Sequence, residues 1–520
     1  MPFRSPYPDA EIPHVPLSEF IFAGVEEAAD EVALIDGPTG RSYTYGETNR
    51  NSQAVAAGLA QLGIGKGDKV AIISPNLPEY SIAVHGIMRA GACVTTMNPL
   101  YLESEIHHQL EDADARVFIT VSAMLEKAKS AAKGTHVEKI FTFDDADGSE
   151  SFTSLMHHAG PPPQVNIDPA NDVAAMLYSS GTTGLPKGVM LTHRNLVAAM
   201  QQTSKLFGTG RARSLLILPV FHIYGFHCVA NFDLLQRGTV VMMPRFDMDQ
   251  FLGYVQNYKI ERACLVPPII LGLVKSPLVD KYDLSSLKLV FSGAAPLDAD
   301  LAAACEKRLN CKVRQGYGLT ETSPGVCGHP IDGDKVRHGS VGVLVPNTEA
   351  KLIDLSTGEE ATSGAPGELW VRGPQVMKGY YKNPDSTRNT ITEDGWLRTG
   401  DIAVIDEDNW ITIVDRAKEL IKFKGLQVAP AELEAVLLNH PSIADAAVIG
   451  VPDEEAGELP KAFVVKKHEV TAEEVLAYVA SQVAPYKKIR IVEFVDQIPK
   501  SPSGKILRRI LKDREREKPA

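Results

Sequence analysis

The chain has 520 residues, more than one hydrophobic core usually serves, and its 44% hydrophobic and 23% charged content is ordinary for a folded protein. A formal net charge of −12 argues against nucleic acid as a partner, because such binding needs clustered Lys and Arg. Six cysteines without a C-x-x-C pair are typical of reduced thiols. No apolar run reaches the length of a membrane span, and neither a signal peptide nor a terminal Ser-Lys-Leu address is recognisable, so we expect a cytoplasmic protein.

The first half of the chain alternates apolar runs with helical segments. Strands are predicted at residues 69–74, 92–97 and 116–121, with helices over 79–89 and 103–112 between them. This alternation, repeated later by the apolar run KLVFSG, predicts parallel sheets covered by helices in a large α/β domain.

A loop rich in small and hydroxyl residues, SSGTTGLPKG, follows the apolar run AAMLY and precedes the extended run VMLT. Glycines let the backbone approach a polyphosphate, while amides, hydroxyls and Lys187 supply donors and charge, so the loop is predicted to bind phosphate. It is not a Walker A loop, because Lys187 is followed by Gly188 rather than by Ser or Thr. A glycine-rich surface turn is the alternative interpretation.

The character of the chain changes after Asp401. Two apolar runs flank the turn residues 406–409 and predict a hairpin that closes the large domain. A smaller α+β domain follows, with a helix opened by Pro430, a second helix with a capping box from Thr471 to Glu474, and three strands. The predicted strands are AAVIGV, KAFVVKK and RIVEFV.

Six motifs occur in a fixed order along the chain, namely SSGTTGLPKGVMLTHRN, QGYGLTE, TGD, DRAKE, KFKGLQ and PKSPSGK. Together they resemble the adenylate-forming superfamily, which includes acyl-CoA and aryl-CoA synthetases, nonribosomal adenylation domains and beetle luciferases. The resemblance implies an ATP-dependent acid–thiol ligase that makes an acyl-adenylate, transfers the acyl group to coenzyme A, and releases AMP and pyrophosphate. ATP, coenzyme A and Mg²⁺ are the expected co-substrates and cofactor, and association into a homodimer is left open.

The same resemblance assigns residues to the nucleotide. The expected contacts are Ser179, Ser180, Gly181, Thr182, Thr183, Gly184, Lys187, Ala294, Gln315, Gly316, Tyr317, Thr320, Asp401, Arg416, Lys422, Gln427 and Lys505. Tyr317 would lay its ring against adenine, Asp401 would accept the ribose hydroxyls and Glu321 would hold Mg²⁺. For Asp401 and Arg416 a purely structural ion pair is the alternative.

Lys505 is the expected catalytic cation, aided by Glu321, Thr320 and His222. Lying in a flexible Ser-Pro-Ser-Gly turn, it resembles the lysine that bridges the substrate carboxylate and the α-phosphate, two anions that repel each other.

The resemblance also implies that the C-terminal domain moves between the two half-reactions. Residues 1–414 form the expected N-terminal domain, 415–418 the hinge around Lys418, and 419–520 the mobile domain. Lys424, Gly425 and Arg245 are then the expected coenzyme A contacts.

Two segments, FHIYGF and SPLVDKYDLSSL, resemble 4-coumarate–CoA ligases more closely than long-chain or acetate-type enzymes. The implied acyl pocket consists of His222, Tyr224, Phe291, Ala294, Gly316, Gly318 and Gly325. Glycines at 316 and 318 suggest a flat slot that suits a planar aryl ring, and Tyr224 could form a hydrogen bond with a substituent of that ring. The expected substrates are therefore 4-coumarate and related cinnamate-type acids.

Three residues of this region depart from the plant pattern. His227, Cys228 and Gly325 stand where plant enzymes have other residues, so medium-chain fatty acids stay open as the alternative substrate class. His222 also has an alternative role, that of a satisfied core histidine.

Three rival functions share the fold. A luciferase-like oxidoreductase would consume oxygen, and a nonribosomal adenylation domain would need a carrier for which the chain leaves no room after Lys505. A non-catalytic nucleotide sensor would be expected to lack Glu321 or Lys505, and both are present.

Overall fold

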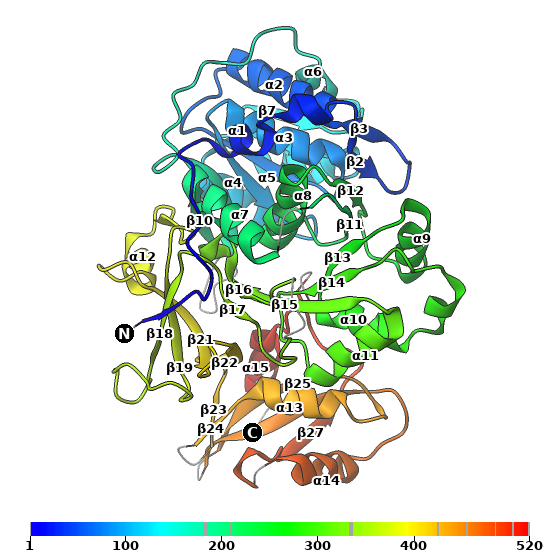
Figure 1. Cartoon of the computed structure of the whole chain (residues 1–520), viewed down its shortest axis with the longest axis vertical. Helices are drawn as coiled ribbons and strands as arrows, with labels where there is room; N and C mark the ends of the chain where they lie inside the picture. The colour runs from blue at the N-terminus through cyan, green and yellow to red at the C-terminus, as the bar shows by residue number, and fades with distance from the viewer. Residues whose placement is uncertain are drawn as a thin grey trace.

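The computed structural model describes residues 2–179, 186–207, 210–331, 336–423, 426–453, 456–483, 485–501 and 504–517. In these ranges a large N-terminal region of sheets and covering helices adjoins a small C-terminal α+β region, drawn in orange and red in Figure 1. The predicted α/β fold class is confirmed. None of the described helices combines the length and the apolar character needed to cross a membrane.

The first sheet contains the predicted βαβ units. Strands β4 (Lys69–Ile73), β5 (Cys93–Met97) and β6 (Ala115–Thr120) run parallel, joined by α3 (Pro78–Arg89) and α4 (Glu103–Asp112). Their apolar runs are continuous because both faces of a parallel sheet are covered. The sheet order is β20-β10-β9-β5-β4-β6-β7-β8, with β7 (Lys139–Thr142), β8 (Glu150–Ser151), β9 (Val173–Ser179), β10 (Lys187–Thr192) and β20 (Gly379–Tyr380).

The second sheet is parallel at its centre and supplies the floor of the candidate site. Its order is β17-β16-β15-β14-β13-β11-β12-β2-β3, with β2 (Val32–Asp36), β3 (Ser42–Thr44), β11 (Arg213–Leu216), β12 (Thr239–Met242), β13 (Arg262–Leu265), β14 (Leu289–Ser292), β15 (Lys312–Gly318), β16 (Gly325–Gly328) and β17 (Val343–Leu344). The strand predicted from KLVFSG is β14. Ligands of open α/β sheets bind beyond the carboxyl ends of such parallel strands.

A third sheet is antiparallel. Apart from β1, its strands follow the second sheet and precede the C-terminal region in the sequence. Its strands are β1 (Phe3–Arg4), β18 (Glu349–Ile353), β19 (Gly367–Arg372), β21 (Leu397–Ile405) and β22 (Ile411–Arg416), in that order. The predicted hairpin is the pair β21–β22, whose pairing extends to Asp401 opposite Arg416.

Helices bind the first two sheets together. Helix α2 (Tyr45–Gln61) begins with a capping box of Thr44 and Glu47 and packs on α3, which contacts both β5 and β2. The remaining helices of this region are α1 (Leu17–Phe22), α5 (Leu125–Ala132), α6 (Phe152–Met156), α7 (His193–Phe207), α8 (Phe232–Leu235), α9 (Met248–Tyr258), α10 (Pro267–Lys275), α11 (Ala299–Leu309) and α12 (Pro384–Thr390).

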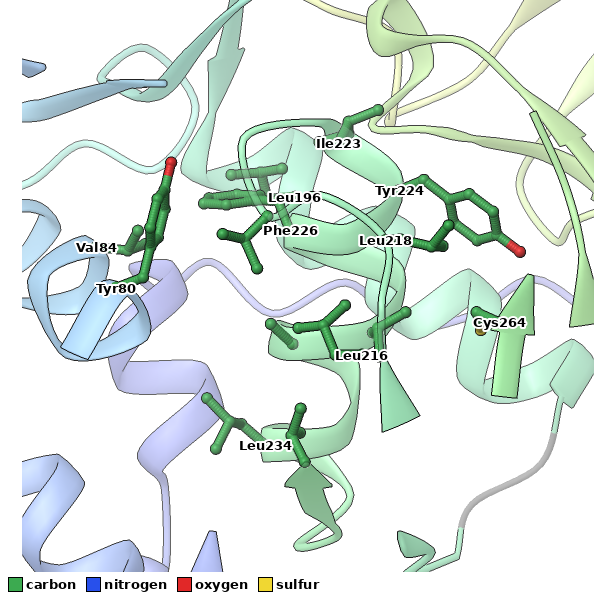
Figure 2. Close-up of a cluster of buried hydrophobic side chains, with 14 of the residues drawn as sticks. Tyr80, Val84, Leu196, Leu216, Leu218, Ile223, Tyr224, Phe226, Leu234 and Cys264 are labelled. Atoms are coloured by element: carbon green, nitrogen blue, oxygen red, sulfur yellow. The ribbon is translucent and has the colours of Figure 1, made fainter. Parts of the chain in front are cut away.

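A π-helical segment, η3 (Tyr224–Asn231), leads into α8 and was not predicted. Figure 2 shows Phe226 of this segment beside Leu196, and both belong to one buried cluster with Leu216 and Leu218. Tyr224 belongs to the same cluster, and its hydroxyl group lies on the side of Cys264. The core therefore anchors η3 while Tyr224 is presented to the second sheet.

The C-terminal region has an apolar core of its own, which includes Leu433, Val448, Val464 and Val475. The predicted helices are α13 (Pro430–Leu438) and α14 (Ala472–Gln482), and the capping box of Thr471 and Glu474 is formed. The other elements are α15 (Arg508–Arg516), β23 (Ile421–Phe423), β24 (Leu426–Val428), β25 (Ile443–Asp453), β26 (Gly457–Lys466) and β27 (Ile491–Phe494).

Candidate active site

The ends of β14 and β15 converge with η3 and with the C-terminal turn at Lys505 around one cavity. Its empty space, including the open mouth, is about 950 Å³, within the range of ligand sites. The structure places all seven predicted acyl-pocket residues in its wall, which are His222, Tyr224, Phe291, Ala294, Gly316, Gly318 and Gly325. Tyr317, Thr320 and Lys505, predicted for the nucleotide and the chemistry, line the same cavity.

Lys505 reaches this cavity from the C-terminal region. It follows Gly504, whose positive φ of +78° favours glycine, and Gly504 lies close to Val266 and Pro268, just beyond the carboxyl end of β13. Burial and the nearby Arg416 lower the pKa of Lys505, while Asp401 and Glu321 oppose that shift. The C-terminal region thus delivers a cation into a site that the N-terminal region builds.

Asp401 is held by two partners on neighbouring elements. Its Oδ2 accepts a hydrogen bond from the Tyr317 hydroxyl at 2.5 Å, and its Oδ1 lies 3.4 Å from Arg416 Nε. Burial raises the pKa of Asp401, against the opposing effect of Arg416. The ion pair considered as the alternative to a ribose site is present, and it also fixes Tyr317, whose ring lines the cavity.

Glu321 connects both ends of the predicted phosphate loop. It lies in η5 (Thr320–Thr322), and its Oε1 accepts hydrogen bonds from Ser179 Oγ and the Tyr380 hydroxyl, each at 2.9 Å. Lys187 stands 5.0 Å above the Tyr380 ring. The flanks of the loop therefore meet at Glu321, whereas Ser180, Gly181, Thr182, Thr183 and Gly184 lie outside the described residues.

The acyl wall is largely apolar and contains two polar rings. The Tyr224 hydroxyl donates to the Phe291 carbonyl at 3.0 Å, and burial raises the Tyr224 pKa well above its usual value, so the phenol stays neutral. A phenol oxygen that donates one hydrogen bond can still accept another. Burial and Lys505 lower the pKa of His222 to about 4, so its imidazole is neutral near pH 7. His222 thus belongs to the cavity wall rather than to the sealed core.

Gly316 and Gly318 both line the cavity, but close packing gives a second reason for the absence of a side chain at each position. A Cβ atom at Gly318 would lie 1.8 Å from the Pro324 carbonyl oxygen, and one at Gly316 would lie 2.7 Å from the Phe291 ring. Both glycines are required by close packing. A Cβ atom at Gly325 would meet nothing within 4 Å, so the open position of the wall is Gly325.

Several predicted contacts are not brought to the cavity. Arg245 and Lys422 are exposed, and the Lys422 backbone N–H donates to Glu458 at 2.7 Å. Gln315 is 3% exposed and accepts a hydrogen bond from the Leu297 N–H, so it supports the loop that carries Ala294.

The coenzyme A and hinge predictions remain largely outside what the structure describes. Lys424, Gly425 and the side chain of Gln427 lie outside the described residues, and Lys418 is an exposed turn residue after β22.

Sequence reasoning missed part of the cavity lining. The additional residues include Thr203, Phe232, Arg262, Cys264, Leu289, Cys327, Ile331 and Val345. Arg262 and Cys264 are two residues apart on β13, as are Leu289 and Phe291 on β14. Because side chains two apart on a strand point to the same face, this spacing could have identified them as neighbours in one wall.

Comparison with known proteins is consistent with this geometry. The model of the AMP-binding enzyme family matches residues 21–381, and that of the AMP-binding enzyme C-terminal domain matches 432–505. A 4-coumarate–CoA ligase of Pinus taeda is 45% identical, over 98% of this chain and 97% of that protein.

Two solved structures share the fold over nearly the whole chain. ATP-bound MatB from Rhodopseudomonas palustris is 29% identical with a TM-score of 0.87, covering 97% of this chain and 99% of that one. The anthranilate CoA ligase AuaEII in complex with anthranoyl-AMP is 25% identical with a TM-score of 0.89, covering 96% and 97%. The superfamily predicted from the six motifs is confirmed, and the chain belongs to the AMP-binding enzyme family.

Proposed function

We propose that the chain is an ATP-dependent, AMP-forming carboxylic acid–CoA ligase whose preferred substrates are 4-coumarate and related cinnamate-type acids. The observation that carries the proposal is Lys505 at a cavity whose wall holds all seven predicted acyl-pocket residues. The relatives named 4-coumarate–CoA ligase support the substrate class.

Adenylation needs two anions, a carboxylate and the α-phosphate of ATP, to approach each other. A cation held between them offsets the charge that builds up in the transition state, and a partly enclosed site strengthens that effect. Lys505 is suited to this role because it lines the cavity and is held near Asp401 and Glu321. No covalent bond to the protein is needed, so positioning and charge stabilisation suffice.

The nucleotide would occupy the side of the cavity formed by Tyr317 and Asp401. Tyr317 presents its ring to the cavity while its hydroxyl is fixed by Asp401, and Asp401 has the acceptor capacity for ribose hydroxyls. Thr320 and the loop that begins at Ser179 would contact the phosphates.

Glu321 fits a role in holding Mg²⁺. Its Oε1 is occupied by Ser179 and Tyr380, and among the described residues no donor engages Oε2. One carboxylate oxygen beside a phosphate site is a usual arrangement for Mg²⁺, which takes most other ligands from substrate phosphates and water. When bound, the ion would neutralise phosphate charge.

The hydroxycinnamate preference rests on the acyl wall. The ring would lie along Phe291 and Gly316, and Tyr224, which donates to the Phe291 carbonyl, can accept a hydrogen bond from a ring hydroxyl. Neutral His222 near Lys505 adds no charge that would compete for the substrate carboxylate.

The second half-reaction calls for a different arrangement of the two regions. We propose that residues 1–414 stay fixed while 419–520 rotate about 415–418, with Lys418 as the hinge. Lys424 and Gly425 would then face the pantetheine path and Arg245 the coenzyme A nucleotide. The separate apolar core of the C-terminal region supports its movement as a unit.

The test is turnover of the purified protein with ATP, Mg²⁺, coenzyme A and a panel of acids. We expect AMP and pyrophosphate in equal amounts, with 4-coumarate giving a higher kcat/KM than medium-chain fatty acids. Release of ADP and orthophosphate, or oxygen uptake with luciferin, would refute the proposal.

A further inference from the structure

The cavity does not end at the Tyr224 hydroxyl. The cavity wall includes Cys264 of β13 and its partner Phe291 of β14. It also includes Arg262 and its partner Leu289, which lie two residues earlier on the same strands. On the helical side Thr203, Cys228 and Phe232 contribute to the cavity wall, and Phe232 lies beside Arg262. Arg262 is three residues from the end of β13 at Leu265, which places it roughly 10 Å below the edge of the sheet.

Arg262 is the charged group of this part of the wall, and it is held firmly. Its side chain is 15% exposed and pairs through Nη2 with Asp233, whose side chain is 1% exposed. Nε donates to Ser214 Oγ at 3.1 Å, and the guanidinium lies 5.5 Å from the Phe232 ring centre. Asp233 and Ser214 lie outside the cavity wall, whereas Arg262 is part of it.

The guanidinium has a donor to spare. Nε is occupied by Ser214, whereas among the described residues Nη1 has no hydrogen-bond partner and Nη2 has only its ion pair with Asp233. Arg262 lines the cavity beside the apolar Leu289 and Phe232, and a charged donor in such a wall favours a ligand that can accept a hydrogen bond there and disfavours a plain hydrocarbon end. Because Asp233 already balances the charge, the matching group is an uncharged oxygen rather than a second carboxylate.

We propose that Arg262 forms a distal subsite that selects acids longer than 4-coumarate carrying a hydroxyl or carbonyl oxygen at their far end. Asp233 and Ser214 are positioning residues that aim the guanidinium. The subsite rests on the proposed ligase function and adds a specificity determinant to it.

The experiment compares a medium-chain fatty acid with its ω-hydroxy analogue of the same length, by pyrophosphate release. A hydrogen bond from a buried charged donor corresponds to roughly 10- to 100-fold in kcat/KM. We expect the wild-type protein to prefer the ω-hydroxy acid by that factor, mainly through KM. The ratio of the two kcat/KM values does not depend on the fraction of the protein that is active.

Two variants and a control locate the effect. Arg262→Met removes the donors, and Arg262→Met combined with Asp233→Asn avoids leaving a buried charge unpaired if the single variant fails to fold. Arg213→Met is the matched control, because Arg213 is an exposed arginine on neighbouring β11 that does not line the cavity. The preference should fall to about one in the double variant and persist in the control.

The outcomes separate the subsite from the ligase function. A wild-type ratio near one, or a preference that persists in the double variant, overturns the subsite. Turnover of 4-coumarate without turnover of either long acid also overturns it and leaves the ligase intact. Failure of every acid to release pyrophosphate overturns the ligase function and the subsite together.

Discussion

The two sides of the cavity are built differently. On the nucleotide side two carboxylates are fixed by neighbouring groups, Asp401 by Tyr317 and Arg416, and Glu321 by Ser179 and Tyr380. On the acyl side, close packing at Gly316 and Gly318 sets the shape of the wall. At Gly325, by contrast, an added Cβ atom would meet nothing within 4 Å. Substitutions on the nucleotide side should therefore lower the rate of the reaction, whereas those at open positions of the acyl wall should change which acids are preferred.

The largest effect is expected for Lys505→Ala. Removing the cation between two anions should cost roughly 3 kcal/mol, or about a hundredfold in overall ligation. Steady-state pyrophosphate release measures it. Lys500→Ala is the control, since Lys500 is in the same turn but pairs with Asp445 at 2.7 Å. Equal losses in the two variants would show that the turn, rather than its cation, matters.

Gly318→Ala should lower stability, although it adds only a methyl group on the acyl side. The new Cβ atom would lie 1.8 Å from the Pro324 carbonyl oxygen, and relieving such overpacking costs about 1–3 kcal/mol. Thermal unfolding would show it as a lower Tm. An unchanged Tm would mean that the backbone at Pro324 shifts easily to accommodate the methyl group.

Acidification should destabilise the fold through its buried histidines. Burial lowers the pKa of His227 to about 4 from 6.5, so its stabilising contribution is complete above about pH 6.5 and is lost as pH falls toward 4. At pH 5 the loss is about 2 kcal/mol for such a group. His227→Gln should therefore flatten the dependence of Tm on pH between 7 and 5. A slope identical to that of wild type would contradict the assignment.

The smallest effect on overall turnover is expected for Gly325→Val. Its Cβ atom meets nothing within 4 Å, so the fold should tolerate the change while the cavity narrows. Activity with 4-coumarate should change only a few-fold, whereas acids with bulkier ring substituents should lose roughly tenfold in kcat/KM. A uniform loss for all acids would place the open end of the cavity elsewhere.

The sequence predicted which residues meet at the cavity better than it predicted the shape of the cavity wall. Short motifs with fixed chemical roles identified Lys505, Tyr317, Asp401 and Glu321, and alternation of apolar runs identified the βαβ units. The direction of a Cβ atom at Gly318, the π-helical start at Tyr224 and the reach of the cavity to Arg262 depend on how distant strands pack. Local residue patterns do not determine such contacts.

The antiparallel sheet was predicted only at its β21–β22 hairpin. Long segments of chain separate β18, β19 and β21, and β1 pairs with β18 across most of the N-terminal region. Pairing over such distances leaves no local signal.

The most direct test of the central claim measures the two half-reactions separately in single turnover, with wild type and Lys505→Ala. We expect acyl-adenylate formation from 4-coumarate and ATP to slow about a hundredfold in the variant. Thioester formation from supplied coumaroyl-adenylate and coenzyme A should stay close to the wild-type rate, because the proposed rotation has by then carried Lys505 out of the cavity. An equal slowing of both half-reactions would contradict the role assigned to Lys505 and the proposed alternation of the two regions.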